Sequence, residues 1–63
     1  MLFKLTFSYL EGQPEGGPFR TVSERIVVSV DKDEEIVDYI SNFKKDDRYG
    51  YRKNIQLVNI QRV

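Results

Sequence analysis

The sequence predicts a small α+β domain in which three strands form one sheet and a single helix packs on one face of it. Three observations support this fold class. Residues 2–10 alternate between apolar and polar side chains, which is the period of a strand with one buried face. Residues 32–45 repeat apolar side chains with the period of an amphipathic helix. Valine and isoleucine together number 12 against 4 leucines, and alanine is absent, which favours strands.

The first two strands are expected at residues 2–10 and 19–30, joined by a hairpin loop. The apolar residues of the first strand share one face: Phe3, Leu5, Phe7 and Tyr9. The segment 11–18 holds three glycines and two prolines, which exclude a regular strand or helix and indicate a loop longer than a two-residue turn. Glu24 interrupts the apolar face of the second strand, so we expect this part of the strand to lie near a sheet edge.

The helix is expected at residues 32–45. Asp31 stands at the N-cap position, and Glu34 three residues later resembles the second member of a capping box. The apolar stripe comprises Ile36, Val37, Tyr39, Ile40 and Phe43. Because this stripe contains β-branched residues and the helix has no alanine, its intrinsic propensity is low, and packing on the sheet must stabilise it.

The third strand is expected from Ile55 to Val63, after a connection over residues 46–53. The apolar parity of this strand switches between Leu57 and Val58. Such a switch indicates either a β-bulge or a strand with both faces partly covered.

The order strand, strand, helix, strand allows two arrangements of the sheet. In the first, the third strand lies beside the first, and the sheet is fully antiparallel with the order 2-1-3. In the second, it lies beside the second strand in a parallel pair with a right-handed crossover. We predict the order 2-1-3, because the regular alternation of residues 2–10 suits a central strand.

Length and composition exclude several classes of function. The 63 residues make a single domain, 1–63. Lysine and arginine total 10 and aspartate and glutamate total 10, so a generic electrostatic nucleic-acid binder is not expected. Without cysteine or histidine the chain lacks the usual nucleophile, general base and soft metal ligands. We therefore expect no catalytic residues, no cofactor and no metal.

No stretch of the sequence approaches the roughly 20 apolar residues that a membrane helix requires. We therefore expect no membrane partner and a cytoplasmic location.

Acidic residues gather around the expected start of the helix: Asp31, Asp33, Glu34, Glu35 and Asp38. A calcium loop of the EF-hand type beginning at Asp31 would require glycine at position 36 and glutamate at position 42. The sequence has Ile36 and Asn42 there, so the motif is not met. We interpret the group as carboxylates that favour the positive end of the helix dipole.

Basic and aromatic residues interleave around the connection before the third strand. They are Lys44, Lys45, Arg48, Tyr49, Tyr51, Arg52 and Lys53. Tyrosine and arginine are enriched at the energetic centres of interfaces, so we predict partner contacts by Tyr49, Tyr51 and Arg52, with Arg48 and Lys53 beside them. In the alternative, the lysines complement the helix C-terminus and the tyrosines cap the core.

These observations predict a small non-catalytic module that binds another protein as an inhibitor, adaptor or assembly subunit. One alternative is a nucleic-acid-binding protein that uses the basic and aromatic segment 44–53. Another is a homo-oligomer formed by pairing of open sheet edges. The compact chain without alanine resembles small phage or accessory polypeptides, although no motif in it identifies a family.

Overall fold

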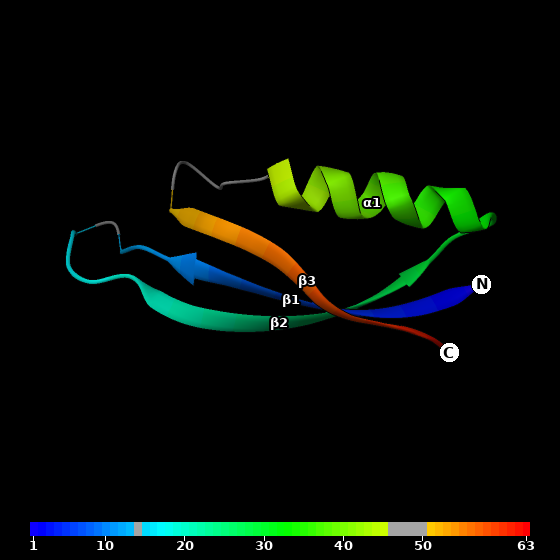
Figure 1. Cartoon of the computed structure of the whole chain (residues 1–63), viewed down its shortest axis with the longest axis horizontal. Coiled ribbons are helices and arrows are strands. Elements are labelled where there is room, and N and C mark those ends of the chain that lie inside the picture. Colours follow the sequence, from blue (N-terminus) through cyan, green and yellow to red (C-terminus); the bar gives the residue numbers. More distant parts are fainter. Residues whose placement is uncertain (14, 46–50) are drawn as a thin grey trace.

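A computed structural model describes residues 1–13, 15–45 and 51–63 of the chain. Its elements are β1 (Leu2–Glu11), β2 (Arg20–Ser29), α1 (Asp33–Lys45) and β3 (Arg52–Arg62). The three strands form one layer, and α1 lies along one face of it (Figure 1). The predicted α+β fold with one helix on one face of the sheet is confirmed.

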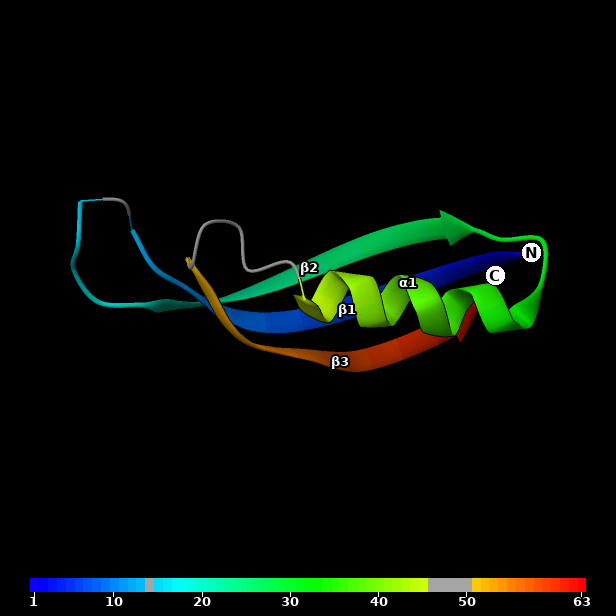
Figure 2. The same cartoon turned by 90° about the horizontal axis from the view of Figure 1, so that it is seen from above.

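The sheet is fully antiparallel and has the strand order β2-β1-β3, as predicted. Seen from above, β1 runs between the two outer strands and α1 lies over it (Figure 2). β1 can occupy the centre because its alternation supplies one apolar face for the helix, while both of its backbone edges bond to neighbours.

The register between β1 and β3 contains two irregularities. Thr6 pairs with Asn59 while Phe7 pairs with Leu57, so Val58 is an extra residue on β3. This confirms the bulge that the change of parity indicated. The second shift lies between Ser8 and Leu10 of β1, opposite the stretch of β3 that contains Asn54. Asn54 adopts a φ of 54°, a left-handed conformation that asparagine tolerates better than most residues.

The core lies between β1 and α1. Its buried members are Phe3, Leu5, Phe7, Val30 and Ile36. The ring of Phe7, which has no exposed surface, stacks on Phe43 with 3.9 Å between the ring centroids and 19° between the ring planes. Tyr39 and Ile40 pack against the same cluster.

The expectation that Val37 belongs to the buried helix stripe is wrong, because 64% of this residue is exposed. Successive side chains on a helix differ in direction by about 100°. The side chain of Val37 therefore points away from the core that buries its neighbour Ile36.

The helix start differs in one detail from the predicted capping box. The side chain of Glu35, and not that of Glu34, accepts a hydrogen bond from the N–H of Asp31 at 3.2 Å. The helix begins at Asp33, one residue after the predicted start, and the acceptor likewise lies one residue later while the N–H that is capped is still that of Asp31. The carboxylates of the first turn still lie at the positive end of the helix dipole.

We expect Phe7→Ala to destabilise the domain by about 3–5 kcal/mol, because it removes a fully buried ring and leaves Phe43 without its stacking partner. In a domain of this size such a loss approaches the whole free energy of unfolding. Urea denaturation followed by circular dichroism measures it. Val37→Ala is the matched helix control, and it should change the free energy by less than about 0.5 kcal/mol.

Candidate functional site

The predicted partner-binding residues that the structure describes lie at the start of β3. They are Tyr51, Arg52 and Lys53, whereas Arg48 and Tyr49 fall outside the described residues. β3 begins at Arg52, three residues before the predicted start at Ile55. Arg52 and Lys53 therefore lie in a strand and not in a connection, and their side chains point to opposite faces of the sheet.

Arg52 is buried, with only 7% of the residue exposed. Its guanidinium carbon lies 4.6 Å from the ring centroid of Tyr9 and 5.5 Å from that of Phe43, both within cation–π range. The structure therefore places Arg52, one of the predicted partner-binding residues, among the side chains of the core. The guanidinium extends the core toward the hairpin end of the sheet, and a partner would reach little of it.

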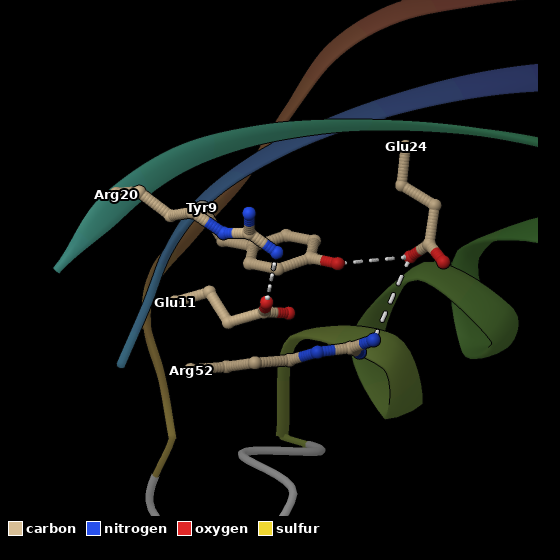
Figure 3. Close-up of polar contacts among 5 residues, drawn as sticks. All are labelled: Tyr9, Glu11, Arg20, Glu24 and Arg52. Carbon is tan, nitrogen blue, oxygen red and sulfur yellow. Dashed lines mark hydrogen bonds and ion pairs between the residues drawn. The ribbon is translucent and has the colours of Figure 1, made fainter. Parts of the chain in front are cut away.

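Glu24 of β2 supplies the opposite charge for Arg52 (Figure 3). Its Oε2 lies 3.8 Å from Nη2 of Arg52 and accepts a long hydrogen bond of 3.5 Å from the hydroxyl of Tyr9. The position of Glu24 on the helix-facing side of an edge strand explains why a carboxylate interrupts the apolar face of β2. As predicted, this edge position leaves the carboxylate partly exposed.

The buried guanidinium is not fully satisfied by hydrogen bonds. Among the described residues, Nη1 of Arg52 has no hydrogen-bond partner. The aromatic faces of Tyr9 and Phe43 stabilise the cation without supplying an acceptor. The energy of holding Arg52 inside the protein therefore depends strongly on the charge of Glu24.

On the opposite side of β3, three exposed residues gather beside the hairpin. We call Phe19, Tyr51 and Lys53 the hairpin-end patch. The ammonium of Lys53 lies 4.4 Å from the ring centroid of Phe19. Phe19 is 42% exposed and Tyr51 is 38% exposed. The patch therefore presents two aromatic residues and one cation to solvent.

Gly12 contacts two members of the hairpin-end patch, the backbone of Tyr51 and the ring of Phe19. Its N–H donates a hydrogen bond of 2.6 Å to the carbonyl oxygen of Tyr51. The ring of Phe19 lies so close that a Cβ added at Gly12 would be 2.9 Å from its Cε2 atom. A side chain at this position would displace the ring, so glycine allows the close approach.

The strand register brings the patch together from distant parts of the chain. Glu11 pairs with Arg20 on β2 and with Arg52 on β3. The next row therefore places Phe19 and Tyr51 on either side of Gly12. Sequence reasoning treated Phe19 only as the start of a strand. The hairpin register was the signal that could have placed it opposite Gly12.

Charge is divided between the two faces of the sheet. The charged strand residues on the face away from α1 are Lys4, Arg25 and Lys53, as their pairing with the polar side of β1 shows. Within the described strands, the acidic residues Glu11 and Glu24 both belong to the helix-facing side. The open face is therefore cationic, while the acidic first turn of α1 lies in the other layer.

The chain matches no family model, no curated protein and no solved structure. In the described part of the chain, no three acidic, histidine or cysteine residues gather where they could hold a metal ion. No described helix has the length and apolar character needed to cross a membrane. The hairpin-end patch and the open sheet face carry the exposed aromatic and cationic side chains described above.

We expect Glu24→Gln to destabilise the domain by about 1–3 kcal/mol, because it leaves the buried Arg52 cation without its ion-pair partner. Glu11→Gln is the matched control, since it breaks the more exposed 3.1 Å pair with Arg20. That change should cost less than about 1 kcal/mol. Equal losses of unfolding free energy for the two variants would contradict the structural role assigned to Arg52.

We expect Gly12→Ala to move the Phe19 ring away from Lys53, because the new methyl group would lie 2.9 Å from Cε2 of that ring. The ring current of Phe19 acts on the side-chain protons of Lys53. The variant should therefore shift these proton resonances toward random-coil values in an NMR spectrum. Unchanged Lys53 resonances would show that the ring does not lie over Gly12.

Proposed function

We propose that this chain is a small non-catalytic module that binds another protein through the hairpin-end patch, Phe19, Tyr51 and Lys53. The observation that carries the proposal is the contact of the Lys53 ammonium with the exposed Phe19 ring, next to the exposed Tyr51, whose backbone bonds to Gly12. Aromatic side chains supply a large contact area at a low cost in conformational entropy, and tyrosine is enriched among interface residues that dominate affinity.

Contacts made by neighbouring residues support this proposal, because they restrict the movement of the hairpin-end patch. Gly12 bonds to the backbone of Tyr51, and Arg52 is fixed between the Tyr9 ring and the Glu24 carboxylate. Because Arg52 lies between Tyr51 and Lys53 in the sequence, its burial positions both neighbours. A preorganised surface loses less entropy when a partner binds.

The chemistry of the patch defines the kind of surface that would complement it. The two rings would fill an apolar depression on the partner, and the ammonium of Lys53 would meet a carboxylate at its rim. Inhibition, adaptor activity and assembly of a larger complex all use such contacts. We place this activity in the cytoplasm.

Nucleic acid is the second candidate partner, and the charge of the open sheet face favours it. Lys4, Arg25 and Lys53 are the charged strand residues described on that face, and all are cations. They could neutralise phosphates while Phe19 or Tyr51 stacks on a base. The core aromatics Phe3, Phe7 and Tyr9 are buried and offer no stacking surface, so this mode would depend on the patch.

Capture from the native lysate with a tagged chain tests the proposal. We expect a specific protein to be retained in the presence of nuclease and at high salt. The combined variant Phe19→Ala and Tyr51→Ala should reduce its capture at least tenfold, because both aromatic contacts are lost. Lys4→Ala combined with Arg25→Ala is the control, since it removes open-face cations and leaves the rings of the patch in place.

Two experimental outcomes would contradict the proposal. Capture that disappears with nuclease or falls steeply with salt would indicate nucleic acid, since each neutralised phosphate releases a counterion. In that case the Lys4 and Arg25 variant should also weaken binding. Undiminished capture of the same protein by the Phe19 and Tyr51 variant would exclude the hairpin-end patch as its binding surface.

A further inference from the structure

In the described part of the chain, the open sheet face has no element covering it. α1 lies along the opposite face, so the molecule has two layers (Figure 1). Lys4 of β1 and Arg25 of β2 are exposed on the open sheet face. The described strand residues of this face include no carboxylate, because Glu11 and Glu24 both belong to the helix-facing side. An acidic surface is therefore the electrostatic complement of the open sheet face.

The register places these two cations near each other, beside an exposed valine. Arg25 pairs with Thr6, which is two residues along β1 from Lys4, and Val27 pairs with Lys4 itself. Two residues span about 6.8 Å along a strand and neighbouring strands lie about 4.8 Å apart, so the Cα atoms of Lys4 and Arg25 are about 8 Å apart. Val27 is 63% exposed. We call Lys4, Arg25 and Val27 the basic cluster.

The outer side of α1 carries a matching set of side chains with the opposite charge. Glu34 and Asp38 are exposed and lie four residues apart, so their Cβ atoms are about 6 Å apart on one face of the helix. Val37 is 64% exposed and points within about 100° of both carboxylates. We call Glu34, Val37 and Asp38 the acidic cluster.

The two clusters complement each other in charge, in spacing and in apolar surface. Each holds two like charges about 6–8 Å apart beside a valine that is more than half exposed. The chain has 10 basic and 10 acidic residues, so no net charge repels one copy from another. Because the clusters lie in different layers of the molecule, copies stacked in one orientation bring opposite charges together. These features favour a second copy of the chain as the occupant of the open sheet face.

We propose that the open sheet face binds the outer side of α1 of a second copy of the chain. In this contact Lys4 and Arg25 form ion pairs with the carboxylates of the acidic cluster, and the exposed valines of the two clusters pack together. The second copy's helix then covers the face of the sheet that the chain's own helix leaves open. A sheet with helices on both faces is a common layered architecture.

The proposed contact joins two different surfaces, so it does not close after two copies. The outer copies each keep one cluster free, and further copies can add in the same way. The hairpin-end patch takes no part in the contact. Its Lys53 pairs with Leu10, six residues along β1 from Lys4, which is about 20 Å. The inference is therefore independent of the proposed partner binding.

Sedimentation equilibrium of the full chain from about 1 μM to about 1 mM tests the proposal, because association by mass action depends on protomer concentration. At low ionic strength, we expect the average mass to rise from the 7.4 kDa of one chain to beyond twice that value. Salt should reduce the association, since it screens exposed charges.

Charge reversal on the open sheet face gives the decisive variant. Lys4→Glu combined with Arg25→Glu should lower the association constant at least tenfold, because the basic cluster then repels the acidic cluster. Arg20→Glu combined with Arg62→Glu is the matched control, since both residues pair with the helix-facing side of β1 and the net charge changes equally. The control should retain most of the association.

A four-residue variant tests for recovery. Adding Glu34→Lys and Asp38→Lys to the first variant exchanges the signs of the two clusters and returns the net charge to zero. This chain should associate as the unmodified chain does, and circular dichroism verifies that α1 is retained. A single-chain mass over the whole range or a mass that levels at two copies would overturn the proposal. Equal losses in the first variant and its control, or no recovery in a folded four-residue variant, would also overturn it.

Discussion

The fold depends on one layer of packing, the apolar row of β1 under α1. Leu5 and Phe7 are fully buried there, and the Phe7 ring stacks on Phe43 of the helix. No disulfide supports this contact, since the chain has no cysteine. A helix with few strong helix formers is stabilised mainly by such packing, so the stability of α1 and the burial of β1 are two aspects of the same interaction.

Arg52 links this core to the candidate site. Its guanidinium contacts the rings of Tyr9 and Phe43 and the carboxylate of Glu24, so it joins all four elements of the fold. A buried cation is a weak source of net stability, because the cost of removing it from water offsets its attraction to its partners. The contacts that bury Arg52 fix the start of β3 and hence the exposed residues on either side of it.

At the surface that we propose to be functional, binding energy would arise from side chains. At the hairpin-end patch, the rings of Phe19 and Tyr51 offer apolar area at a fixed place, and Lys53 adds charge complementarity. The patch would discriminate between partners by side-chain shape.

The sequence by itself predicted the four elements, because side-chain period and parity are local properties that a chain displays before it folds. It favoured the strand order 2-1-3 and offered a bulge near Val58 as one of two interpretations, and the structure confirms both. It also indicated that Glu24 would lie at an edge. Only the tertiary structure decided which side chains meet. Phe19 reaches Lys53, and Glu24 reaches Arg52, across strands that are distant in the sequence. Such pairs depend on register, and a shift of one residue at the start of β3 would exchange the buried and exposed faces of Arg52 and Lys53.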